Sequence, residues 1–211
     1  MNVLVLAPHP DDETIGCGGS LRLHVERGDR VAVVFLTSGE LGLDHLPPVE
    51  AHRIRETEAE AAAQILGLHA LSFLRLPDWQ LGENLDAGRS TLSPFIEREQ
   101  PGLIYVPHPG EWHPDHRATF SMLAAALPSA PPEIRCYEVW TPLAVHSEVE
   151  DITSTIAHKL RAIRCYQSQL ATFRYDRSAR GLAAYRGALA SRTRYAEVFG
   201  NPSPSISVEE G

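Results

Sequence analysis

The sequence predicts an α/β protein: a Rossmann-like, open, mainly parallel and doubly wound sheet with helices on both faces. Short, nearly continuous apolar runs recur along the chain, and such runs are typical of strands covered on both faces. Segments with helical spacing separate the runs, so strand and helix alternate. Acids and histidines follow the runs, as expected if one edge of the sheet carries a site.

The elements follow in order from these patterns. The apolar runs predict five strands, at residues 3–7, 31–37, 71–76, 103–107 and 134–140. Among the helices, residues 51–66 give the clearest pattern, since Ile54, Ala62 and Ile65 belong to a face repeated at intervals of three and four, and Gly67 fits a helix stop. Similar spacing predicts three more helices, at residues 14–27, 88–99 and 114–127.

The C-terminal third has a different character. Residues 159–194 contain nine basic side chains, with helix-like spacing in IAHKLRAIRCYQSQLA. This segment could wrap the sheet edge, line a substrate entrance, form a solvated basic face or contact a second copy in a homo-oligomer, and the sequence leaves these alternatives open. The composition of residues 201–211 is that of a flexible tail, so we expect one domain over residues 1–200.

Composition excludes several classes of protein. The 211 residues carry 27 acidic and 19 basic side chains, a formal net charge of −8, which argues against nucleic acid as a partner. The three cysteines form no C-x-x-C pattern, which fits a reducing compartment. The N-terminus lacks a basic leader, and no run approaches the ~20 apolar residues of a membrane span. We therefore expect a cytoplasmic protein without a membrane span.

Polar motifs follow the first four predicted strands. These motifs are HPDDE, TSGE, LPDW and HPGEWHPDH, at residues 9–13, 37–40, 76–79 and 108–116. Because ligands of open α/β sheets bind at the carboxyl ends of the strands, the four loops are expected to meet at one site.

Two of these motifs repeat the tripeptide His-Pro-Asp at strand-to-helix junctions. His9 and Asp12 stand three apart, and so do His113 and His116. Two imidazoles and one carboxylate with an open position for water are a standard hydrolytic arrangement, in which zinc lowers the pKa of its water to about 7. A neighbouring carboxylate that reaches the water without binding the metal can act as general base.

These residues resemble the PIG-L/LmbE-like family of zinc-dependent N-acetylglucosaminyl deacetylases. The first motif of that family, A-H-P-D-D-E, is similar to PHPDDE here, and H-P-D-H is intact at residues 113–116. The similarity extends through TSGE, RETEAEAAAQILG, LPD, SQL and YAEVFG, so residues 1–200 would form a single LmbE-like domain. The implied substrate is an N-acetylated amino sugar or glycoconjugate, and the implied cofactor is Zn²⁺, with Fe²⁺ as the alternative.

The resemblance also implies roles for individual residues. His9, Asp12 and His116 would hold the metal, and Asp11 would be the general base that activates metal-bound water. His113 would stabilise the oxyanion.

Three further positions carry implied roles. Asp115 would orient His113. Arg55 and Asp78 would contact sugar hydroxyls, although Arg55 fits an ion pair on its own helix about equally well, with Glu56 or Glu58.

Alternatives and departures remain. His9, Asp11 and His116 also fit the ligand pattern of a non-haem iron oxygenase, and a catalytically inactive sugar-binding protein could share the scaffold. Tyr166 stands where many relatives have His, and Glu111, where Asp is common, is predicted to face solvent. The glycines of GCGGS, residues 16–20, are expected to let the first helix pack closely rather than to bind phosphate.

Overall fold

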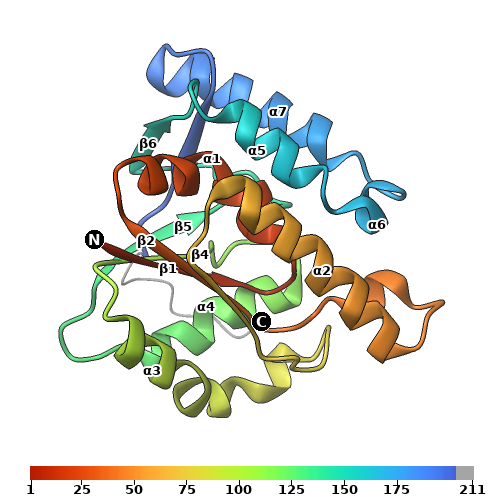
Figure 1. Ribbon diagram of the computed structural model, residues 1–211. Coiled ribbons are helices and arrows are strands. Elements are labelled where there is room, and N and C mark those ends of the chain that lie inside the picture. Colours follow the sequence, from red (N-terminus) through yellow and green to blue (C-terminus); the bar gives the residue numbers. More distant parts are fainter. Residues whose placement is uncertain (203–211) are drawn as a thin grey trace.

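The sheet at the centre of the molecule is parallel, as the apolar runs predict. The fold is described from a computed structural model, which places residues 1–202; of the predicted tail, residues 203–211 lie outside the described part. The strand order is β3-β2-β1-β4-β5, with β1 in the middle (Figure 1). The five strands are β1 (Asn2–Ala7), β2 (Arg30–Phe35), β3 (Ala70–Phe73), β4 (Leu103–Pro107) and β5 (Glu133–Tyr137). All four neighbouring pairs run parallel, which confirms the predicted fold class.

Helices cover both faces of the sheet, as Figure 1 shows. One face is covered by α3 (Gly88–Glu99) and α4 (Pro114–Ala126), and the other by α1 (Asp12–Glu26) and α2 (Pro48–Leu66). Two 3-10 helices, Glu40–Leu43 and Leu81–Ala87, lie in the connections that follow β2 and β3. Strand and helix therefore alternate as predicted, and the helix predicted over residues 51–66 begins three residues earlier, at a proline that fits a first helical turn.

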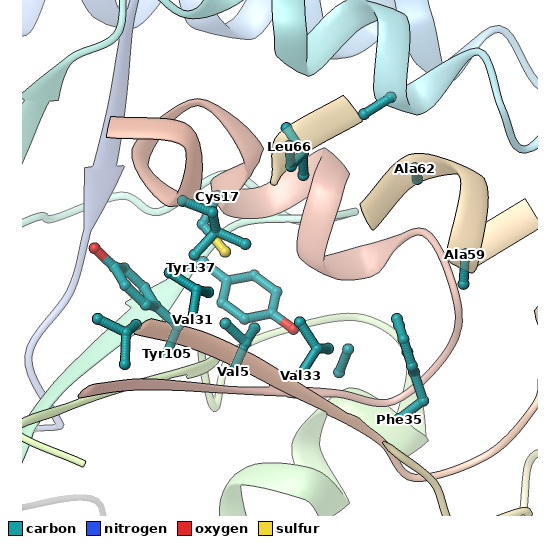
Figure 2. Close-up of a cluster of buried hydrophobic side chains, with 14 of the residues drawn as sticks. Val5, Cys17, Val31, Val33, Phe35, Ala59, Ala62, Leu66, Tyr105 and Tyr137 are labelled. Atoms are coloured by element: carbon teal, nitrogen blue, oxygen red, sulfur yellow. The ribbon is translucent and has the colours of Figure 1, made fainter. Parts of the chain in front are cut away.

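The pleat of β1 divides the core into two layers. Val3 and Val5 point to the face covered by α1 and α2, whereas Leu4 and Leu6 point to the face covered by α3 and α4. Figure 2 shows the first layer, in which strand side chains meet Cys17 of α1 and three residues of α2. Because both faces are buried, β1 can be apolar from Val3 to Ala7 instead of alternating with polar residues.

The glycines of the first helix have the packing role that the sequence predicts. A Cβ added at Gly16 would lie 2.3 Å from the Tyr137 ring, and one at Gly19 would lie 2.8 Å from Ile152. Helix α1 therefore approaches β5 and the C-terminal region more closely than any larger side chain permits.

The C-terminal third forms a second layer over α1 and α2. It comprises α5 (Ile156–Ile163), α6 (Gln167–Leu170), α7 (Tyr175–Arg186) and the antiparallel pair β6 (Glu148–Asp151) and β7 (Ala196–Phe199). Two of its nine basic residues are internal: Lys159 lies 2.6 Å from Glu197, and Arg186 pairs with Glu138. The segment is thus only partly a solvated basic face.

Some strands end earlier than predicted. β3 stops at Phe73 rather than residue 76, and Arg75 adopts a left-handed backbone with φ of 54°. β5 stops at Tyr137, after which the chain turns into the site described below. No helix within residues 1–202 combines the length and apolar character needed to cross a membrane.

Candidate functional site

The loops after all five strands of the parallel sheet meet at its carboxyl edge, around a pocket of about 520 Å³. The loop after β2 contributes Gly39, Leu41 and Gly42. We call the buried polar cluster of His9, Asp11, Asp12, His113 and His116 the floor. The first four of these residues line the pocket, and His116 lies behind Asp12, with its Nε2 atom 3.3 Å from Oδ2 of that carboxylate. All five side chains are buried, although they belong to loops about a hundred residues apart in the sequence. The structure thus brings together the two His-Pro-Asp motifs that the sequence singles out.

Asp12 lies between two imidazoles. Its Oδ2 atom is 3.1 Å from Nδ1 of His9 and 3.3 Å from Nε2 of His116. In a tetrahedral site with bonds near 2.1 Å, neighbouring ligand atoms stand about 3.4 Å apart, so these spacings suit two edges of such a site. Burial would raise the pKa of Asp12, but the adjacent His116 and His9 rings hold it well below its usual range.

His116 carries the clearest sign that a ligand belongs here. The residue is 0% exposed, and neither of its ring nitrogens has a hydrogen-bond partner within residues 1–202. Buried polar atoms are nearly always paired, so an orphaned imidazole between two carboxylates, those of Asp12 and Glu111, fits a metal ligand. A ring nitrogen from each of His9, His113 and His116 lies within 4.8 Å of the others.

A second carboxylate, that of Asp78, contacts His9 on the ring nitrogen that does not face Asp12. The Nε2 atom of His9 lies 3.0 Å from Oδ1 of Asp78, while Nδ1 faces Asp12. The oxygens of Asp78 also accept backbone N–H groups, from Trp79 at 2.9 Å and from Leu41 at 3.1 Å. Asp78, for which the resemblance implies a sugar contact, is therefore placed to fix the His9 ring, as carboxylates commonly do behind metal-binding histidines.

Asp11 has an unusual backbone. Its φ angle is 124°, a region that residues with a side chain rarely adopt and that occurs mainly where surrounding contacts enforce it. Burial raises the pKa of Asp11 to about 7, and the Arg55 guanidinium opposes the shift. The carboxylate does not lie between the imidazoles, so it is available for another task beside them.

Glu13 and Tyr166 hold this strained turn. The Glu13 carboxylate accepts the backbone N–H of Asp11 at 3.2 Å and the Tyr166 hydroxyl at 2.6 Å, and it also accepts the Thr14 hydroxyl. All of these groups are buried. Tyr166, the departure noted in the sequence, thus connects the C-terminal layer to the backbone of Asp11.

Arg55 turns toward the site rather than along its helix. It donates to the carbonyl of Pro10 at 2.6 Å and to Oδ2 of Asp11 at 3.4 Å. The acids that could have paired with it are engaged elsewhere, Glu56 with Arg75 and Glu58 with Ser168. The local ion pair that the sequence allowed is therefore not formed.

His113 caps the helix that it begins. Its Nδ1 accepts the backbone N–H of Asp115 at 3.2 Å, which leaves the proton of the neutral ring on Nε2. Burial and the neighbouring His9 and His116 lower the pKa of His113 to about 4. The Asp115 carboxylate faces the loop after β3, where it accepts the N–H groups of Trp79 and Leu81 at 2.7 and 3.1 Å. Within residues 1–202, the hydrogen bond between His113 and Asp115 therefore comes from the backbone N–H of Asp115 and not from its carboxylate.

Glu111 corrects one sequence-based expectation. It was predicted to face solvent, but it is buried, and it accepts backbone N–H groups from Val139, Trp140 and Thr141. Its Oε2 atom also lies 3.7 Å from Nδ1 of His116. The run EWHPDH placed an acid next to the second motif, but only the tertiary structure shows that this acid joins the loops after β4 and β5.

Fold and site together define a class of protein: a Rossmann-like α/β protein with a buried His/Asp group that could hold a metal ion, at the carboxyl ends of the strands. Within that class, the chain belongs to the PIG-L family, whose model, described as GlcNAc-PI de-N-acetylase, matches residues 4–127. The match runs from β1 to the end of α4 and so includes both His-Pro-Asp motifs. The family resemblance drawn from those motifs is confirmed.

Several relatives are named as deacetylases. The chain is 30% identical over 218 residues to the diacetylchitobiose deacetylase of Thermococcus kodakarensis, covering 92% of this chain and 80% of that protein. It is 31% identical over 186 residues to "Probable N-acetyl-alpha-D-glucosaminyl L-malate deacetylase 2" of Bacillus anthracis, covering 81% and 82%. The solved structure of N,N'-diacetylchitobiose deacetylase from Pyrococcus horikoshii matches with a TM-score of 0.82 at 28% identity, covering 94% of this chain and 82% of that one.

Proposed function

We propose that this protein is a metal-dependent N-deacetylase that hydrolyses the acetamide of an N-acetylglucosamine-type sugar or glycoconjugate. The observation that carries the proposal is that two neighbouring carboxylates have different surroundings. Asp12 lies between two imidazoles, where it could bind a metal ion, whereas Asp11 lies beside them and pairs with Arg55. A metal-assisted hydrolase needs both kinds of carboxylate. The deacetylase activities named for the relatives support the same proposal.

His9, Asp12 and His116 are the residues that would hold the metal. Asp12 suits the third position better than His113 does, because its carboxylate adds a negative charge and lies close to both other ligands. Zn²⁺ or Fe²⁺ suits such a donor set, and either ion would supply Lewis acidity that polarises the acetyl carbonyl and lowers the pKa of a water.

Asp11 would carry out the proton transfers. In amide hydrolysis a water oxygen bonds to the acetyl carbon, the C–N bond breaks, and the departing nitrogen gains a proton. Asp11 takes the proton from the attacking water and returns it to the amine, so the carboxylate ends the cycle as it began. The ion pair with Arg55 and the bond from its own N–H to Glu13 hold Asp11 in position for both transfers.

His113 would serve the carbonyl oxygen. With Nδ1 occupied by the helix cap, its Nε2–H is the remaining donor of a neutral ring, and His113 lines the pocket. A donor aimed at developing negative charge is commonly worth a factor of about 10² to 10³ in rate. Here the backbone N–H of Asp115 is the group that would fix the tautomer.

The rival interpretations fit less well. An oxygenase centre built on His9, Asp11 and His116 would need Asp11 between the imidazoles, but Asp12 occupies that place. The scaffold is also a parallel α/β sheet rather than the all-β jelly roll of such enzymes. An inactive sugar-binding protein would keep the pocket without the need for a second, strained carboxylate.

Acetate release tests the proposal. Protein loaded with zinc or iron(II) is assayed on N-acetylglucosamine and N,N'-diacetylchitobiose, alongside Asp11→Asn and the exposed control Asp151→Asn. We expect Asp11→Asn to keep its metal and to lose about 10²- to 10⁴-fold in kcat, while the control matches the wild type. Undiminished activity in Asp11→Asn would exclude it as the base, and metal-loaded wild type that binds sugar without releasing acetate would favour the inactive binding protein.

A further inference from the structure

All three tryptophans of the chain stand around the mouth of the pocket. Trp79, Trp112 and Trp140 follow β3, β4 and β5, and they are 50%, 62% and 39% exposed. Phe173 and Tyr175, from the segment that enters α7, continue the series. We call these five aromatic residues the aromatic rim. An exposed apolar group of this size beside a pocket is typical of a surface that binds something.

The rim is continuous. The ring centroids of Trp79 and Trp112 lie 6.2 Å apart, and those of Trp112 and Trp140 lie 6.1 Å apart. Trp140 then contacts Phe173 and Tyr175 at 5.5 and 5.6 Å. Trp79 also lies against the floor, 4.4 Å from the ring of His113. The surface therefore begins at the reacting group and extends outward.

The backbone under the rim is fixed although the rings are exposed. The N–H of Trp79 is held by Asp115 at 2.7 Å, that of Trp112 by the Thr141 hydroxyl at 2.8 Å, and that of Trp140 by Glu111 at 3.1 Å. Such anchoring reduces the backbone entropy that binding would otherwise cost, because the backbone that carries the three rings is organised before a ligand arrives.

The rim offers a ligand no charge. Apart from the floor, Arg55 and Asp78, the lining residues within the described part of the chain are aromatic or uncharged, including Leu41 and Gln169. The Arg55 guanidinium is buried and engaged by Asp11 and Pro10. Recognition of a carboxylate or phosphate normally uses an available Arg or Lys, so an anionic group beyond the acetamido sugar would find no partner here.

We propose that the aromatic rim is a subsite for an uncharged sugar ring joined to the acetamido sugar. A pyranose ring has an apolar C–H face that can lie on an indole, and hydroxyls at its edge that the Gln169 amide and the indole N–H groups can meet. The substrate is then a neutral disaccharide or longer saccharide rather than an acidic conjugate. This inference rests on the proposed deacetylase function, but it concerns a different surface of the pocket.

Substrate competition tests the subsite. Values of kcat/KM are measured for N-acetylglucosamine, N,N'-diacetylchitobiose, N-acetylglucosaminyl malate and a phenyl N-acetylglucosaminide. We expect the disaccharide to be the best of the four. A malate conjugate that matches or exceeds the disaccharide would overturn the proposal, and a phenyl glycoside that exceeds it would show an apolar site rather than a sugar site.

Variants of the rim test whether a preference for the disaccharide depends on its aromatic residues. In Trp112→Ala, the ratio of kcat/KM for the disaccharide to that for the monosaccharide is expected to fall about threefold to tenfold, and Trp112→Phe should restore part of it. Tyr185→Ala, an exposed aromatic residue outside the pocket, is the matched control and should keep the ratio. An unchanged ratio in Trp112→Ala contradicts the proposal.

A binding measurement separates failure of the subsite from failure of the proposed function. N,N'-diacetylchitobiose is titrated into metal-free protein while tryptophan fluorescence is followed. Saturable binding that weakens in Trp112→Ala supports the subsite even if no substrate releases acetate, in which case only the deacetylase proposal fails. If the protein releases acetate but shows no preference for substrates with a second sugar ring, the deacetylase proposal stands and the subsite proposal fails.

Discussion

The floor and the aromatic rim line the same pocket but are built in opposite ways. The floor consists of ionisable side chains within nine residues of the ends of β1 and β4, all buried and nearly all held by specific polar contacts. The rim consists of large apolar rings that are largely exposed and touch mainly one another. In the proposed deacetylase, the sheet edge would fix the geometry of the reaction, and the rings above it would determine which substrates reach that geometry.

Physical chemistry accounts for this difference. Burying a charged or polar group is costly unless it is paired, so the floor residues constrain one another and few substitutions are tolerated there. An exposed ring with a fixed backbone can be exchanged for another side chain at little cost to folding. Changes to the floor should therefore affect metal binding and kcat, and changes to the rim should affect substrate preference.

The largest effect is expected from His116→Ala, which removes an imidazole from the floor. The variant should lose its bound metal, and acetate release should fall by about 10³-fold or more, because the metal supplies several kcal/mol of transition-state stabilisation. Metal content by mass spectrometry and acetate release are measured together. The exposed His45→Ala is the control. Stoichiometric zinc in purified His116→Ala would mean that this imidazole is not a ligand.

The sequence predicted the floor well, because its residues belong to motifs at strand ends. Apolar runs located the strands to within a few residues, and the carboxyl-end rule then predicted that His9 and His116 lie close together although they are distant in sequence; their ring centroids are 5.5 Å apart. The ends of β3 and β5 were less predictable, since the left-handed backbone at Arg75 leaves no signal in hydrophobic spacing.

The contacts that hold the floor were not predictable from spacing. Glu111 looks like any acid in a polar loop, and its burial depends on backbone N–H groups of a strand end some thirty residues away. The Tyr166 contact with Glu13 joins segments 153 residues apart. Pairings of this kind arise from the tertiary fold, and no local pattern in a single sequence specifies them.

An intermediate effect is expected from Asp78→Asn, which tests whether Asp78 supports the floor residue His9 or binds the substrate. If Asp78 orients His9, as their 3.0 Å contact indicates, metal affinity should fall about 10- to 100-fold while KM changes little in metal-saturated enzyme. If Asp78 instead binds sugar hydroxyls, KM should rise and metal affinity should stay unchanged. Zinc titration and steady-state kinetics distinguish the two outcomes, with exposed Asp44→Asn as the control.

The smallest effect is expected from Tyr166→Phe, which alters the support of the floor through Glu13 and leaves every floor side chain in place. Glu13 would keep its bonds to Thr14 and to the N–H of Asp11 but lose the Tyr166 hydroxyl, a contact whose removal commonly costs about 1 kcal/mol. We expect kcat to fall about threefold to tenfold, with metal content and the preference for the disaccharide unchanged.

That pattern would separate positioning from simple destabilisation. A variant that is merely less stable shows a lower Tm but normal kcat per folded molecule, whereas a loosened Asp11 lowers kcat at temperatures where all molecules are folded. Tyr185→Phe on the surface of α7 provides the matched control. If Tyr166→Phe changed the substrate ratio instead of kcat, the strained turn at Asp11 would belong with the rim, and the division between a floor for chemistry and a rim for selection would have to be redrawn.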